Sequence, residues 1–143
     1  MDQPRTQMAG HRTMPHTADL RVDAWAGSRE RCIAEAVLGT VESFLDVSAA
    51  HPTGTHHFQL TASSDVDLLV AVLEEVVYLM ETSGEVPVDV ELVPLDATVG
   101  VRFATIGAEA LPQVGAVPTA VSLHELTLAA SPGGWFCSVT LDV

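Results

Sequence analysis

The stretch SSDVDLLVAVLEEVVYLMETSG, residues 63–84, most strongly limits the folds open to this chain. Two serines and Asp65 stand at its start and Gly84 at its end, a pattern typical of a capped helix. Its apolar residues recur at spacings of three and four, and others widen the stripe. They are Val66, Leu69, Val70, Leu73, Val76, Val77 and Met80, widened by Leu68, Val72 and Leu79. We expect other elements to cover most of this helix.

The neighbouring segments predict strands and one further helix. Apolar residues alternate from Ala18 to Ala24 and from Phe58 to Ala62, and between these runs a helix begins after Ser28. Further strands are predicted at about 86–92, 99–106, 119–128 and 135–143. This order predicts an α+β fold, with two helices packed on a mainly antiparallel or mixed β-sheet as a two-layer sandwich. It disfavours a doubly wound parallel fold.

The length of 143 residues is typical of one domain. We expect residues 1–11 to form a mobile tail and residues 12–143 a single domain. No apolar run is long enough to cross a bilayer, and the first fourteen residues lack the apolar stretch of a secretory signal. We therefore expect a soluble, cytoplasmic protein without membrane contact, in which Cys32 and Cys137 are reduced thiols on apolar faces. The oligomeric state stays open.

The charge of the chain argues against direct nucleic-acid binding. It carries 19 acidic residues against 6 basic ones, for a formal net charge of −13, and every basic residue is an arginine. Six scattered arginines do not build the basic groove that holds RNA or DNA. An acidic surface instead favours divalent cations and basic protein partners. The alternative is that the charge only keeps an apolar chain soluble.

Two aspartates are predicted to lie off the core, one near each end of the sequence. Asp19 belongs to the polar face of the first predicted strand, and Asp142 to that of the last. If those strands are neighbours, the two carboxylates lie side by side, near the carbonyl and terminal carboxylate of Val143. Close carboxylates favour a shared proton or a hard cation such as calcium or magnesium. The alternative is two ordinary solvated side chains.

Four motifs occur in the order seen in the archease family, and the chain resembles that family over about residues 12–143. They are HTADLRV, DLLVAVLEEVVYLMETSG, AVPTAVSLHELTL and the closing WFCSVTLDV. The resemblance implies a small non-enzymatic protein that binds a divalent cation, generally calcium, with magnesium or manganese as alternatives. It also implies an activator of an RtcB-type RNA ligase in tRNA splicing and RNA repair, which promotes guanylylation and turnover of that ligase.

The resemblance also assigns residues to the metal site. In the family, the ligands are the aspartate of His-Thr-Ala-Asp and the penultimate aspartate, with the carbonyl of the residue that follows it. These positions correspond to Asp19, Asp142 and Val143 here. Family members commonly carry a lysine where this chain has Thr119. The resemblance therefore implies that the metal site is retained and that activation of the partner is altered.

The histidines are open to two interpretations. His16 either supports Asp19 through a hydrogen bond or is simply a turn residue. For His56, His57 and His124 no ligand partner stands at a recognisable spacing, and we expect solvated or packing roles.

Two other classes of function stay open. A general chaperone or protein-interaction module could use an exposed apolar face, with Trp25 and Phe136 as candidates. A metal-dependent hydrolase would also need clustered carboxylates, but it requires a substrate cleft that the sequence does not reveal. Glu74 and Glu75 are interpreted as residues at the margin of the second helix, without a catalytic role.

Overall fold

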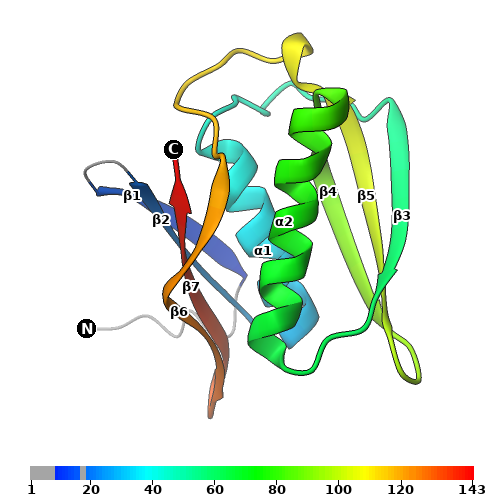
Figure 1. Ribbon diagram of the computed structural model, residues 1–143, viewed down its shortest axis with the longest axis vertical. Helices are drawn as coiled ribbons and strands as arrows, with labels where there is room; N and C mark the ends of the chain where they lie inside the picture. The colour runs from blue at the N-terminus through cyan, green and yellow to red at the C-terminus, as the bar shows by residue number, and fades with distance from the viewer. Residues whose placement is uncertain (1–8, 17–18) are drawn as a thin grey trace.

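The structure is a computed structural model, and it describes residues 9–16 and 19–143. Figure 1 shows the arrangement of the elements. In chain order they are β1 (Gly10–His16), β2 (Asp19–Ala26), α1 (Arg29–Glu42), β3 (Gly54–Leu60), α2 (Asp65–Ser83), β4 (Glu85–Pro94), β5 (Val99–Gly107), the 3-10 helix η2 (Ala108–Ala110), β6 (Ala120–Ser131) and β7 (Gly134–Asp142).

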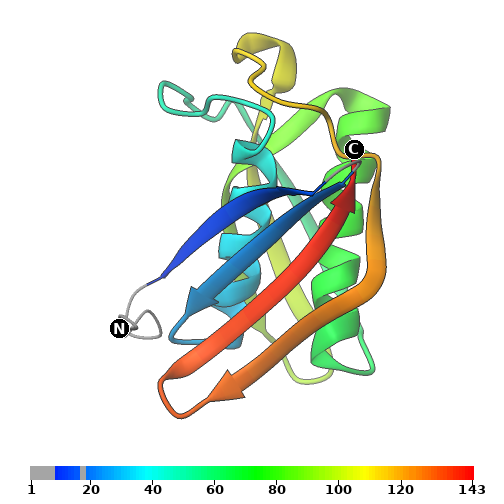
Figure 2. The same ribbon diagram turned by 90° about the vertical axis from the view of Figure 1, so that its left-hand side faces the viewer.

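The strands form two antiparallel sheets with the helices between them. The four-stranded sheet has the order β1-β2-β7-β6 and the three-stranded sheet the order β3-β5-β4. Helix α1 contacts β1, β2 and β7 on one side and β4 on the other, while α2 contacts β6 and β4 (Figures 1 and 2). The α+β class is confirmed, but the layering differs from the expected two-layer sandwich, because two sheets enclose the helices.

The width of the apolar stripe on α2 explains this arrangement. At 100° per residue, its buried side chains cover roughly half of the helix circumference. They are Leu68, Leu69, Val72, Leu73, Val76, Val77 and Leu79. One sheet cannot cover so wide a surface, so the helix packs against both sheets and against α1.

The predicted helix ends are confirmed. The Ser28 hydroxyl accepts a hydrogen bond from the Arg31 amide at 3.1 Å, and the Ser64 hydroxyl accepts one from the Asp67 amide at the same distance. Gly84 ends α2 in the left-handed conformation, with φ of 69°, which a side chain would disfavour.

Strand β1 corrects the expected N-terminal boundary. Residues 10 and 11, which we assigned to the tail, belong to β1, which pairs with β2 along its whole length. The sequence GHRTMPH does not show the apolar alternation typical of a strand, because Met14 is its only long apolar side chain and it contains a proline. Of the other tail residues, Ala9 belongs to no helix or strand, whereas residues 1–8 lie outside the described residues, as does the start of the expected first strand at Ala18.

One apolar core joins both sheets and both helices. Its members include Val22 and Val139 of one sheet, Phe103 of the other, and Ile33 and Leu69 of the two helices. Within residues 9–16 and 19–143, no helix combines the length and the apolar character needed to cross a membrane.

Candidate metal centre

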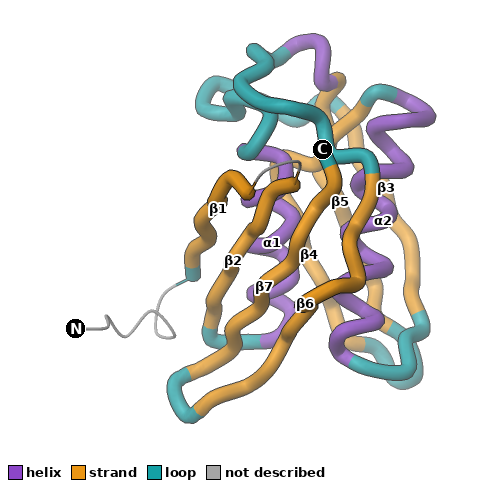
Figure 3. Tube along the Cα trace, turned by 60° about the vertical axis from the view of Figure 1, so that its left-hand side comes forward, coloured by secondary structure: helices purple, strands orange, loops and turns teal. Residues whose placement is uncertain are grey.

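The register of β2 and β7 brings the two predicted ligands together. The strands lie side by side in the four-stranded sheet (Figure 3), and Asp19 is directly opposite Asp142. Directly opposed residues of an antiparallel pair share a face, with Cβ atoms about 4.5–5.5 Å apart. The flanking Leu141 is fully buried on the other face, so both aspartates lie off the core. The predicted proximity of Asp19 and Asp142 is therefore confirmed.

The other predicted site residues lie near the same end of the sheet. The β1–β2 ladder pairs His16 with Asp19, whereas a hydrogen bond from the His16 side chain stays a prediction. Val143 directly follows Asp142 and is exposed. No group of three or more His, Cys, Asp and Glu side chains suited to a metal occurs among residues 9–16 and 19–143. The predicted site thus depends on two carboxylates and a main-chain oxygen.

Thr119 lies directly beside Asp142. Its amide donates a hydrogen bond to the Asp142 carbonyl oxygen at 2.8 Å, and its hydroxyl donates to the same oxygen at 3.3 Å. Both residues are exposed. Thr119, the position at which the resemblance implies a lysine in other family members, is therefore next to the pair formed by Asp19 and Asp142.

The burial of a further carboxylate on this face was not recognised from the sequence. Asp23 belongs to the outward face of β2, yet it is only 1% exposed. Arg12 lies 3.1 Å from its Oδ2 atom and Arg21 lies 3.3 Å from its Oδ1 atom. A buried carboxylate requires such cationic partners. Because Arg12 is in the strand that we did not predict, the sequence pattern could not reveal this cluster.

A cavity of about 330 Å³ is lined in part by Asp19. Its other lining residues are Met14, Arg21, Ser122, His124, Glu125 and Thr140. The register of β6 with β7 shifts between Ser122 and Thr127, and Glu125 within this bulge has φ of 56°. The bulge places the strongly exposed His124 at the rim of the cavity, a position that the sequence spacing did not indicate.

The other histidines and glutamates have roles outside this site. His56 Nε2 forms a hydrogen bond of 2.8 Å with Glu75 Oε2, and its ring packs against Phe58 and Phe103, which confirms a packing role. Glu74 is exposed and Glu75 half-buried, as expected for a helix margin.

Both cysteines are free and buried, as expected. A hydrogen bond with Cys32, together with burial, raises the pKa of the Cys137 thiol well above its ordinary value. The Cys32 thiol donates to the Ala24 carbonyl at 3.6 Å. Protonated, buried thiols are poor nucleophiles and poor metal ligands.

Sequence comparisons identify a matching protein family and two similar proteins. The model of the Archease protein family (MTH1598/TM1083) matches residues 11–143. Two proteins described as probable protein archease, from Mycobacterium tuberculosis strains CDC 1551 / Oshkosh and ATCC 25618 / H37Rv, are each 60% identical to this chain over 135 residues. Each match covers 94% of this chain and 75% of the relative.

Two solved structures share the fold. The solution structure of Methanobacterium thermoautotrophicum protein 1598 matches with a TM-score of 0.74 at 20% identity, over 94% of this chain and 99% of that one. The crystal structure of an archease from Thermotoga maritima, described as a possible chaperone, matches with a TM-score of 0.61 at 17% identity, over 92% and 96% of the two chains. At these identities the likeness shows the fold alone.

Proposed function

Because this chain belongs to the archease family, we propose that it is a metal-binding activator of an RtcB-type RNA ligase that acts in tRNA splicing or RNA repair. The observation that carries the proposal is the cross-strand pair of Asp19 and Asp142. Like charges directly opposite each other are destabilising in a sheet. A shared cation relieves that repulsion, so the pair is suited to a divalent ion.

The donor atoms fit a hard cation. Asp19 and Asp142 offer carboxylate oxygens, the ligands that calcium, magnesium and manganese prefer. The Asp142 carbonyl already accepts two hydrogen bonds from Thr119, so we assign the main-chain ligand to the carbonyl of Val143. We propose calcium as the resident ion, because two of the three ligand residues, Asp142 and Val143, are exposed and leave room for the six to eight oxygen ligands that calcium takes.

The proposed role follows from the number of ligands. Calcium takes about six to eight oxygen ligands. Asp19, Asp142 and Val143 leave several positions for water and for groups of a partner. A bound cation supplies positive charge that can bind phosphate or carboxylate oxygens. The net charge of −13 disfavours RNA on this chain. We therefore assign RNA binding to the ligase and the presentation of a cation to this chain.

A general chaperone function is a weaker alternative. Its candidate residues, Trp25 and Phe136, are a directly opposed pair, but both are half-buried. A Cβ atom on Gly10 would lie 2.7 Å from the Trp25 ring, so β1 packs closely against the indole. The large exposed apolar residues of the described chain are spread over α2, β4, β6 and loops. They are Tyr78, Val93, Leu95, Val114, Leu123 and Val143. We therefore favour a specific partner.

Multiple-turnover ligation with an RtcB-type ligase, GTP and divalent metal tests the proposal. We expect this chain to raise the number of turnovers several-fold and to accelerate guanylylation of the ligase. Serum albumin at the same concentration serves as the control for non-specific protection of the enzyme. Equal stimulation by albumin, or none by this chain, would contradict the proposal. Suppression of aggregation of unrelated proteins without added metal would favour the chaperone function.

We expect Thr119→Lys to increase stimulation of the ligase. The exposed Thr119 contacts the Asp142 carbonyl, so a lysine there places a cation beside the acidic pair. Exposed charge contacts contribute up to about 1 kcal/mol, which corresponds to at most roughly fivefold in rate. Ligation time courses of the two forms measure the effect, and Thr119→Gln is the neutral control of similar length. Equal rates for all three would mean that a lysine at this position is dispensable.

A further inference from the structure

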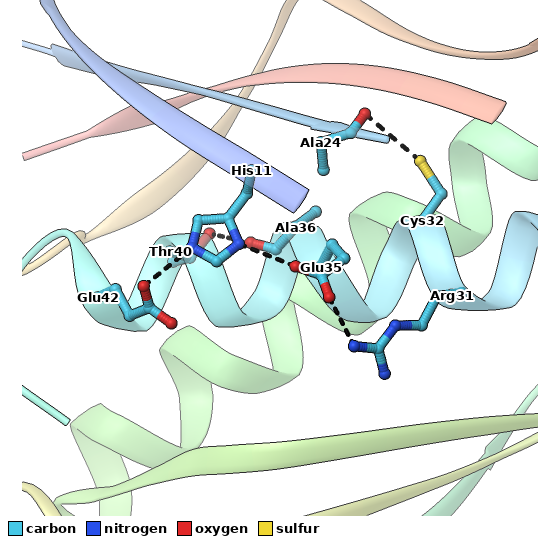
Figure 4. Close-up of polar contacts among 8 residues, drawn as sticks. All are labelled: His11, Ala24, Arg31, Cys32, Glu35, Ala36, Thr40 and Glu42. Carbon is cyan, nitrogen blue, oxygen red and sulfur yellow. Dashed lines mark hydrogen bonds and ion pairs between the residues drawn. The ribbon is translucent and has the colours of Figure 1, made fainter. Parts of the chain in front are cut away.

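His11 bridges two glutamates at the junction of β1 and α1. Its Nδ1 atom lies 2.9 Å from Glu35 Oε1, and its Nε2 atom lies 2.9 Å from Glu42 Oε1 (Figure 4). Ionised carboxylates only accept hydrogen bonds, and a neutral imidazole has only one N–H to donate. With both ring nitrogens against carboxylates, the arrangement matches the doubly protonated, positively charged ring.

Helix α1 provides a notch for this ring. Glu35, Gly39 and Glu42 follow one another at spacings of four and three, so they share one face of the helix. A Cβ atom on Gly39 would lie 3.0 Å from two carbon atoms of the His11 ring and 3.0 Å from Val22 Cγ1. Glycine therefore leaves the space in which the ring lies between the two carboxylates.

The surrounding charges strengthen the bridge. The side chain of Glu35 is 7% exposed, and its second oxygen accepts a hydrogen bond from Arg31 Nη2 at 2.7 Å. From β2, the residues on this face are apolar, among them Val22 and Ala24. The neighbouring cation of β1, Arg12, lies on the opposite face and pairs with Asp23. Glu35, Glu42 and Arg31 are thus the described charged groups that face His11.

We propose that His11, Glu35 and Glu42 form a protonation-dependent latch that fastens β1 to α1. Within the described residues, β1 is an edge strand whose sheet neighbour is β2. An edge strand with one neighbour depends strongly on side-chain contacts of this kind. The far end of β1 pairs with Asp19, so the latch holds the strand that borders the candidate metal centre.

The direction of the pH effect follows from the contacts. Burial lowers the pKa of His11, but the hydrogen bonds and charges of Glu35 and Glu42 together outweigh burial and raise the pKa above its ordinary value of 6.5. A group whose pKa is raised on folding stabilises the folded state fully below its unfolded pKa. That contribution is lost as the pH rises through the folded pKa. The latch is therefore fully closed below about pH 6.5, and it opens at more basic pH, as the pH rises through the raised pKa of His11.

Two measurements on the metal-free chain without ligase test the latch. We expect the ring resonances of His11 to titrate with a midpoint above 6.5 in NMR spectra. At pH 6, His11→Gln should lower the hydrogen-exchange protection of the β1 amides by about tenfold, the size expected for charge-assisted hydrogen bonds. At pH 9 the parent and the variant should show equal protection. The exposed His57→Gln is the control and should change neither result.

Glu42→Gln provides a second test that does not endanger the core, because the Glu42 side chain is 44% exposed. It should lower the His11 midpoint while leaving the fold intact. A His11 midpoint at or below 6.5, an unchanged midpoint in Glu42→Gln, or the same loss of β1 protection in His11→Gln at pH 6 and pH 9 would each overturn the latch. Since no metal or ligase is present, such a result would leave the proposed function untouched.

Discussion

Replacing Asp142 by alanine should weaken calcium binding strongly while leaving the thermal unfolding of the metal-free chain almost unchanged. Asp142 is exposed and lies off the core, and surface substitutions usually change stability by about 0.5 kcal/mol or less. Removal of one of two opposed carboxylates also relieves their repulsion. The cation, in contrast, loses one of two anionic ligands, and we expect its affinity to fall on the order of a hundredfold or more.

Asp19→Ala should have the same effect on the cation, and stimulation of the ligase should fall in both variants. Calorimetric titration with calcium and magnesium, thermal unfolding with and without metal, and multiple-turnover ligation measure the three quantities. Asp96→Ala is the matched control, because Asp96 is an exposed aspartate in the turn between β4 and β5. If both site variants bound calcium and stimulated the ligase like the parent, Asp19 and Asp142 would be ordinary solvated residues.

Local sequence patterns were sufficient to predict most of the helices and strands. The alternation around Asp19 and Asp142 depends only on the two-residue period of a strand, and the ends of α2 depend on Ser64 and Gly84 within the helix itself. The prediction that the two aspartates lie close together needed a further assumption, namely that the first and last predicted strands pair. That pairing is present, with Asp19 opposite Asp142.

Features that depend on partners far apart in the sequence could not be predicted in this way. Asp23 alternates with apolar residues like any outward side chain, whereas in the structure it is buried and paired with Arg21 and with Arg12 of β1. His11 is isolated in the sequence, and its glutamate partners lie 24 and 31 residues away. Both depend on β1, whose polar sequence and proline gave no strand signal.

The number of layers could not be predicted for a related reason. A wide apolar stripe shows that α2 is covered, but it does not tell whether one sheet or two provide the cover. That choice depends on how β3, β4 and β5 pair with one another and separate from the other four strands. Strand pairing of this kind is a long-range property, which the period of a single segment does not contain.

Leu69→Ala should destabilise the chain more than any of the surface variants above. Leu69 is fully buried on α2, in the layer where that helix contacts strands of both sheets. Truncation of such a leucine leaves a cavity that rigid sheets on two sides cannot easily close, and costs about 2–5 kcal/mol. This loss is a large part of the roughly 5–15 kcal/mol that stabilises a typical domain.

Urea denaturation of the parent and the variant measures this loss through the shift of the midpoint at constant slope. Tyr78→Ala is the matched control on the same helix, because Tyr78 is 58% exposed, and we expect it to change stability by no more than about 0.5 kcal/mol. Similar midpoints for the two variants would contradict the burial of Leu69 in the core between the helices and the sheets. A large shift for Leu69→Ala with little effect of Tyr78→Ala would support the packing of the buried face of α2 against β4, β6 and α1.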